Sequence, residues 1–103
     1  MDLTQNEWQL QLNEATDAVV LDVRTDYEFD EGYISNAINL DLYEAQKFMD
    51  KMASLDKQKS YYIYCKSGSR SSQACALMNQ MGFEKTYNLL GGITEWEGPI
   101  IQH

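Results

Sequence analysis

The sequence predicts a small α/β domain with a mainly parallel central sheet flanked by helices on both faces. Short β-prone runs alternate with segments of helical periodicity, and no segment repeats. A length of 103 residues leaves room for one compact domain, so we expect residues 1–103 to form it. The apolar content of 44% is typical of a globular chain with a real core.

Two capping boxes predict helix starts in the first third of the chain. Thr4 with Glu7 opens a short helix, and Thr25 with Glu28 opens a helical turn. The turn should stop near Gly32, because glycine is favoured just beyond a helix end.

Four β-prone runs predict the strands of the sheet. The third of them leads straight into Cys65, which we therefore place at the carboxyl end of a strand, where parallel sheets bind ligands. The expected strands cover residues 18–22, 37–40, 61–64 and 86–89.

Three further helices follow from apolar residues at helical spacing. The clearest spans residues 43–53, and a second spans residues 70–81 and ends at Gly82. A short last helix is expected at residues 93–97.

The charge distribution excludes several classes of protein. The net charge is −8, and residues 1–31 hold nine acids against one base, so we expect no nucleic-acid partner. No apolar run approaches the roughly 20 residues that span a bilayer, so we expect no membrane partner either. The start of the sequence lacks a basic and an apolar signal region, which predicts a cytoplasmic protein.

The two cysteines, Cys65 and Cys75, are too few for a disulfide framework and lack the spacing of zinc ligands, so we expect no metal. Cys75 lies near the apolar face of a predicted helix, where we expect it to be buried and inert. The single histidine, His103, ends the chain, so a group other than histidine must activate Cys65.

The segment after Cys65 carries the chemistry. A strand-to-helix turn with a central glycine can point successive backbone N–H groups inward and form an anion cradle at the positive end of the next helix. Two cations within the segment add to this field, which favours the thiolate form of Cys65. We expect the cradle to hold an anionic substrate or a charged intermediate on sulfur. The segment consists of Lys66, Ser67, Gly68, Ser69 and Arg70.

At this point the chain resembles the rhodanese-like sulfurtransferases, over nearly its whole length. Three signatures carry the resemblance, in the family's order. They are Leu21-Asp22-Val23-Arg24 with Glu28-Phe29, Gly32-Tyr33-Ile34, Ala37 and Asn39-Leu40; the loop Cys65 to Ser71; and Gly82-Phe83, Asn88-Leu89, Gly91-Gly92-Ile93 and Trp96.

The resemblance implies a thiosulfate sulfurtransferase. The cysteine at position 65 would attack a donor such as thiosulfate, form a persulfide, and pass that sulfur to cyanide or a thiol. Amides of residues 66–70 would stabilise the persulfide, Lys66 would attract the anionic donor and Arg70 would brace the loop. The resemblance also implies a polar network of Asp22, Arg24 and Glu28 beneath the loop, and no cofactor.

Two positions depart from the family pattern. The residue after Gly32 is usually histidine in this family and here is Tyr33, which we interpret as structural. The segment after Trp96 is short, so we expect a truncated last helix.

Two alternative functions remain open. A persulfide relay or interaction module would need the same loop and would pass sulfur to a partner protein. A cysteine-dependent phosphatase or arsenate reductase has five residues between cysteine and arginine, whereas four separate Cys65 from Arg70. The sulfurtransferase assignment requires inward-facing amides and a Cys65 thiol that is not deeply buried.

Overall fold

The computed structural model describes residues 1–102, so the expectation for His103 lies outside the described residues. Its centre is a five-stranded sheet with the order β1-β6-β5-β2-β4. Every neighbouring pair in this sheet is parallel, which confirms the prediction. The strands are Asp2–Leu3 (β1), Thr86–Leu89 (β6), Ser60–Tyr64 (β5), Ala18–Asp22 (β2) and Ile38–Asn39 (β4).

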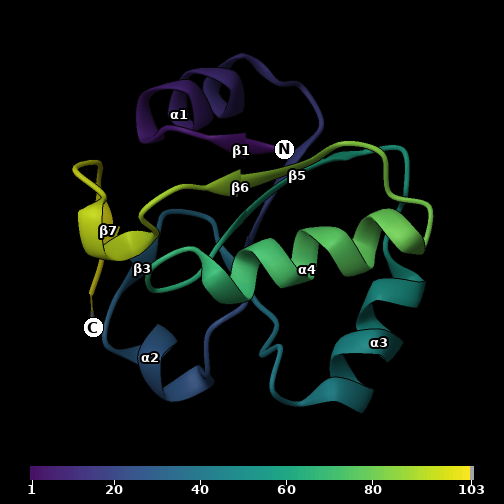
Figure 1. Cartoon of the computed structure of the whole chain (residues 1–103). Helices are drawn as coiled ribbons and strands as arrows, with labels where there is room; N and C mark the ends of the chain where they lie inside the picture. The colour runs from purple at the N-terminus through teal and green to yellow at the C-terminus, as the bar shows by residue number, and fades with distance from the viewer. Residues whose placement is uncertain (103) are drawn as a thin grey trace.

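Helices cover both faces of the sheet (Figure 1). Helix α1 lies on one face, while α3 and α4 lie on the other. Both predicted capping boxes form, at Thr4 and Thr25. Among residues 1–102, no helix has the length and apolar character needed to cross a bilayer. The helices are Gln5–Glu14 (α1), Asp26–Asp30 (α2), Ala45–Ser54 (α3) and Ser69–Gln80 (α4).

Strand β5 is buried along its whole length and contributes side chains to both halves of the core. Successive side chains of a strand point to opposite faces, so Tyr61 and Ile63 join the layer beneath α3 and α4, and Tyr62 and Tyr64 join the layer beneath α1. Cys65 continues this alternation and falls on the α4 side. The sheet thereby directs the Cys65 side chain toward the start of α4.

The sequence did not predict a second, two-stranded antiparallel sheet. Strands β3 (Tyr33–Ile34) and β7 (Ile100–Ile101) form it, and the main sheet also gains the unpredicted β1. Each of these strands has two residues, too few for alternation to register in a sequence. The helix expected at residues 93–97 is a single 3₁₀ turn, η1 (Ile93–Glu95), and the chain then turns back as β7.

The loop between β6 and η1 holds the loop after β5 in place. The Ile93 amide donates to the Cys65 carbonyl at 3.0 Å, and the Thr94 amide donates to the Lys66 carbonyl at 3.1 Å. This approach depends on Gly92, which adopts a φ of +60°. A Cβ on Gly92 would lie 2.6 Å from the Cys65 carbonyl oxygen and closer still to the Lys66 carbonyl, so only glycine fits.

Replacing Gly92 by alanine should lower the free energy of unfolding by about 2–4 kcal/mol, because it combines backbone strain with a clash against main-chain atoms. Denaturant unfolding measures the change. Gly82→Ala is the matched control: Gly82 has a φ of +100°, but its Cβ would meet only the Lys57 side chain, at 3.6 Å. Equal losses in the two variants would contradict the close approach at Gly92.

Candidate active site

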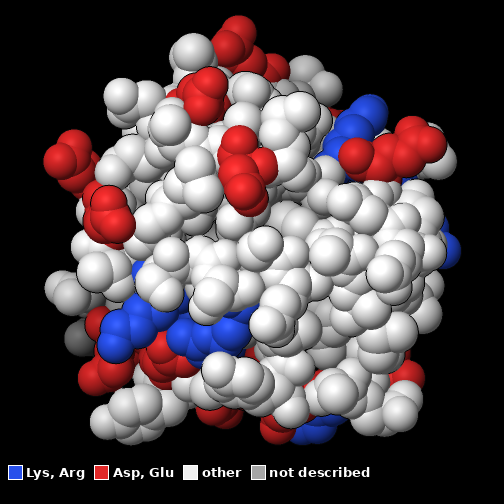
Figure 2. Space-filling view, in the orientation of Figure 1, with Lys and Arg blue, Asp and Glu red and all other residues white. Residues whose placement is uncertain are grey.

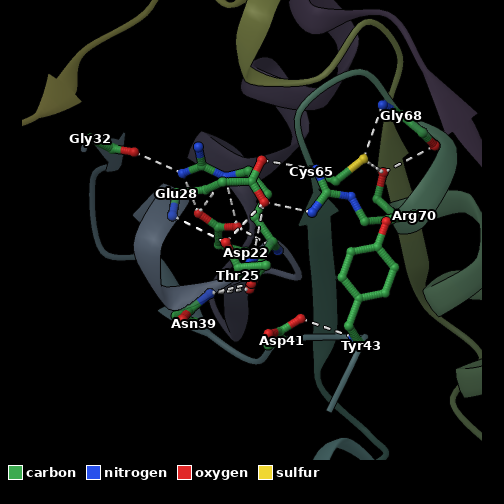
Figure 3. Close-up of polar contacts among 12 residues, drawn as sticks. Asp22, Thr25, Glu28, Gly32, Asn39, Asp41, Tyr43, Cys65, Gly68 and Arg70 are labelled. Carbon is green, nitrogen blue, oxygen red and sulfur yellow. Dashed lines mark hydrogen bonds and ion pairs between the residues drawn. The ribbon is translucent and has the colours of Figure 1, made fainter. Parts of the chain in front are cut away.

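The loop between β5 and α4 wraps around the sulfur of Cys65 (Figure 3). The Gly68 amide donates a hydrogen bond to Cys65 Sγ at 3.0 Å, and the Ser71 hydroxyl lies 3.3 Å from the same atom. The amides of Ser67 and Ser71 also act on the sulfur. Of the amides of residues 66–70, the Gly68 amide donates to the sulfur in this structure, and the Ser71 hydroxyl is the second donor; an inward ring formed by all five amides stays a prediction.

Gly68 and the start of α4 give the ring its geometry. Gly68 is the residue before the helix and has a φ of +110°, a left-handed conformation that glycine adopts without strain. Helix α4 then begins at Ser69, and its first turn contains no acidic residue. The positive end of the helix is thus left uncompensated beside the sulfur, where it favours a negative charge.

These hydrogen bonds lower the pKa of the Cys65 thiol. Burial alone would raise this pKa, because it penalises the thiolate. The Ser71 hydroxyl and the amides of Ser71, Gly68 and Ser67 stabilise the thiolate and outweigh that effect, so the pKa lies below its usual range. This direction agrees with the expectation from the sequence, and it requires no histidine.

The expectation of an accessible thiol was wrong for this conformation. Cys65 is 0% exposed, because the same loop that supplies the hydrogen bonds closes over the sulfur. A sulfur without exposed surface can be reached only when the loop moves aside. The loop residues Lys66, Ser67 and Ser69 are themselves exposed.

Arg70 braces the loop against α2. Its two terminal nitrogens bind the two oxygens of Glu28 at 2.7 and 3.0 Å, a bidentate ion pair that holds the pKa of Glu28 at about 2. The guanidinium also lies over the Tyr43 ring, 5.3 Å from its centroid. Since Glu28 also caps α2, one carboxylate ties that helix to the active loop. The charge of Arg70 is compensated, which fits a bracing role better than direct contact with a donor.

Asp22 and Arg24 form a separate buried ion pair. Arg24 Nη2 lies 2.6 Å from Asp22 and donates to the Gly32 carbonyl at 2.7 Å. The hydroxyl of the buried Tyr64 donates to Asp22 at 2.8 Å. We expected Asp22, Arg24 and Glu28 to form one polar network beneath the loop. The structure instead has two separate ion pairs, Asp22 with Arg24 and Glu28 with Arg70.

Positive side chains gather over the loop between β5 and the start of α4, whereas the face over the rest of α4 is largely uncharged (Figure 2). Of the two cations in the loop, Lys66 is the one that forms no ion pair within residues 1–102. It is exposed, and its expected role in attracting an anionic donor stays a prediction.

Sequence reasoning gave no role to two residues behind the sulfur, Ser71 and Asn88. The Ser71 hydroxyl lies within hydrogen-bond distance of the side-chain oxygen of Asn88, and the Asn88 amide group donates to Asp2 at 3.0 Å. Asn88 is 2% exposed. The sequence did place Asn88 in the third signature of the family, but its contact with Ser71 depends on the pairing of β6 with β5.

Cys75 takes no part in this site. It lies on the buried face of α4, and burial raises the pKa of its thiol to about 11. The expectation that it is buried is confirmed.

Comparison with known proteins decides the family. The profile of the rhodanese-like domain matches residues 5–99. The chain belongs to the rhodanese-like sulfurtransferase family. A sulfurtransferase of Allochromatium vinosum is 36% identical over 85 residues, covering 82% of this chain and 77% of that protein. The putative sulfurtransferase YtwF of Bacillus subtilis is 40% identical over 79 residues, covering 77% and 73%.

Rhodanese-like domains also occur within longer proteins. The tRNA uridine(34) hydroxylase of Cytophaga hutchinsonii is 37% identical over 82% of this chain, but the match spans 28% of that enzyme. The crystal structure of a rhodanese-like domain protein from Staphylococcus aureus matches with a TM-score of 0.83 and 31% identity, covering 99% of this chain and 97% of that one. The rhodanese-like fold is therefore shared along almost the whole chain.

Replacing Ser71 by alanine should raise the pKa of Cys65, because the thiolate loses a hydrogen bond. Such a bond to a charged group is worth about 1.5–3 kcal/mol, so the rate of Cys65 alkylation at neutral pH should fall roughly ten-fold. The pH profile of iodoacetamide labelling, followed by intact mass in a Cys75→Ser background, measures the shift. Ser72→Ala, an exposed neighbour, is the control. An unchanged pKa of Cys65 in Ser71→Ala would show that the Ser71 hydroxyl does not stabilise the thiolate.

Proposed function

We propose that this rhodanese-like protein is a thiosulfate sulfurtransferase that works through a Cys65 persulfide. The observation that carries the proposal is the set of hydrogen bonds from Gly68 and Ser71 to Cys65 Sγ. These donors lower the pKa of the thiol, and they would equally hold the negative charge of a persulfide. The name of one relative agrees with this: a thiosulfate sulfurtransferase GlpE of Coxiella burnetii is 32% identical over 79% of this chain.

In the first step, the loop that covers the sulfur moves aside and the Cys65 thiolate attacks the outer sulfur of thiosulfate. A new S–S bond forms on Cys65, the S–S bond of thiosulfate breaks, and sulfite leaves with the electron pair. In the second step, cyanide or a thiol takes the outer sulfur and restores the thiolate. In each step one bond to the transferred sulfur forms and another breaks, so the cycle needs no metal or organic cofactor. It does need a reduced thiol, which the cytoplasm maintains, and both cysteines are free.

Incubation with thiosulfate should add one sulfur atom to the protein, visible by intact-protein mass. Cys65→Ser should abolish this adduct and the transfer of sulfur to cyanide. Cys75→Ser should retain most of both, because Cys75 is buried away from the loop and its pKa is raised. An adduct that persists in Cys65→Ser would overturn the proposal.

Replacing Lys66 by alanine should mainly weaken donor binding. A solvent-exposed charge pair is worth up to about 1 kcal/mol, so the KM for thiosulfate should rise about two- to five-fold with little change in kcat. Steady-state kinetics at low and high salt measure the effect, which salt should reduce. Lys85→Ala is the matched control. Lys85 lies just before the amino end of β6, whereas Cys65 follows the carboxyl end of the neighbouring parallel strand β5. An unchanged KM would count against Lys66 as the donor-binding residue.

A further inference from the structure

A chain of hydrogen bonds leads from the protein surface to the sulfur of Cys65. The Ser71 hydroxyl lies 3.3 Å from Cys65 Sγ and within hydrogen-bond distance of the side-chain oxygen of Asn88. The Asn88 amide group donates in turn to the carboxylate of Asp2, an exposed residue, at 3.0 Å. Asp2 lies opposite Asn88 in the parallel pairing of β1 with β6, so both side chains point to the same face of the sheet. The first strand is thus connected to the Cys65 sulfur through two side chains.

The neighbours of Asn88 fix the orientation of its amide group. The NH₂ group faces two acceptors, the Asp2 carboxylate at 3.0 Å and the Gly68 carbonyl at 3.4 Å. In the reversed orientation the Asn88 oxygen would face both acceptors, at a position that is 2% exposed, where an unpaired polar group is costly. The Asn88 oxygen therefore points at Ser71, whose hydroxyl donates to it.

The Ser71 hydroxyl carries one proton but has three acceptors around it. They are the Asn88 oxygen, the Gly68 carbonyl at 3.2 Å and the Cys65 sulfur at 3.3 Å. While Cys65 is a thiol, the proton can stay on the hydrogen bond to Asn88, because the Ser71 oxygen can accept from the S–H group. When Cys65 ionises, the hydroxyl must turn from Asn88 to the sulfur to stabilise the thiolate. The buried Asn88 oxygen then loses its donor, and this loss offsets part of what the sulfur gains.

We propose that Asn88 and Asp2 are positioning residues that restrain the ionisation of Cys65. Asn88 competes with the thiolate for the single proton of Ser71, and Asp2 keeps the Asn88 amide in the orientation that competes. The restraint has a chemical consequence, because a thiolate becomes less nucleophilic as its parent thiol becomes more acidic. The proposal goes beyond the proposed function, since it concerns the ionisation of Cys65 and not the compound that the thiolate attacks.

Other charged groups lie near Cys65 but take no part in this chain of hydrogen bonds, and the substitutions below leave them unchanged. They are Asp22 and Arg24 at the end of β2, Glu28 in α2, Lys66 in the loop and Arg70 in α4. The Asp2 carboxylate also acts on its surroundings through space, as any charge does. Because Asp2 is exposed, added salt screens that effect, whereas the orientation of the Asn88 amide does not depend on salt.

The test follows the ionisation of Cys65 directly, through the ultraviolet absorbance of its thiolate as a function of pH. The protein is the full chain with the Cys75→Ser substitution, so that Cys65 is the only thiol. Asp2→Asn removes the acceptor and supplies an amide that can donate to the Asn88 oxygen once the Asn88 amide reverses. The reversed NH₂ group donates to Ser71, and the Ser71 hydroxyl is then free to donate to the sulfur.

Asp2→Asn should move the midpoint of this titration to lower pH, and Asp2→Ala should move it in the same direction by less. Below the midpoint, the rate of iodoacetamide labelling should rise about two- to three-fold in Asp2→Asn. One ordinary hydrogen bond changes the thiolate population roughly five-fold, and the lower nucleophilicity of a more acidic thiol offsets about half of that gain on a logarithmic scale. Asp17→Asn is the matched control and should leave the midpoint in place, because Asp17 is an exposed aspartate just before the amino end of β2.

The double variant Asp2→Asn with Ser71→Ala tests whether the effect passes through the Ser71 hydroxyl. Without that hydroxyl, Asp2→Asn should no longer move the midpoint. A shift of equal size with and without the hydroxyl would assign the effect to the Asp2 charge acting through space and would overturn the proposal. An unchanged midpoint in both Asp2 variants would overturn it as well. Neither result bears on the proposed function, which fails instead if thiosulfate leaves no sulfur on Cys65.

Discussion

The parallel pairing of β2 with β5 is the constraint on which the site depends. Asp22 lies opposite Tyr64 in this register, and the Val23 amide donates to the Tyr64 carbonyl at 3.0 Å. Both strands therefore end at the same edge of the sheet, and the segments that follow them leave side by side. One of these segments carries Arg24 and the other begins with Cys65. A slip of one residue would turn Cys65 to the opposite face, away from α4.

Charge compensation then decides what the loop can hold. Both arginines near Cys65 are bound to carboxylates, so they act as braces and not as anion ligands. The sulfur is left facing hydrogen-bond donors that carry no full charge, namely backbone amides and one hydroxyl. Such donors stabilise a single negative charge on sulfur in the thiolate, and they would do the same in the proposed persulfide.

Local signals made most of the fold predictable. The capping boxes at Thr4 and Thr25 depend on residues three positions apart, and the glycine-centred turn after Cys65 lies within one short segment. Contacts between distant segments were beyond such reasoning. The pairing of Glu28 with Arg70 joins residues 42 positions apart, and the contact between Ser71 and Asn88 requires β6 to lie beside β5. The burial of Cys65 depends on how tightly the loop closes, which residue types do not reveal.

The placement of both thiols also bears on oxidation. An intermolecular disulfide requires two sulfur atoms about 2 Å apart, which two folded proteins cannot readily bring about when their cysteines are buried. Cys65 is 0% exposed and Cys75 5%. The folded protein should therefore resist covalent dimerisation in air, whereas small oxidants such as peroxide should be able to pass the loop and convert Cys65 to its oxyacids.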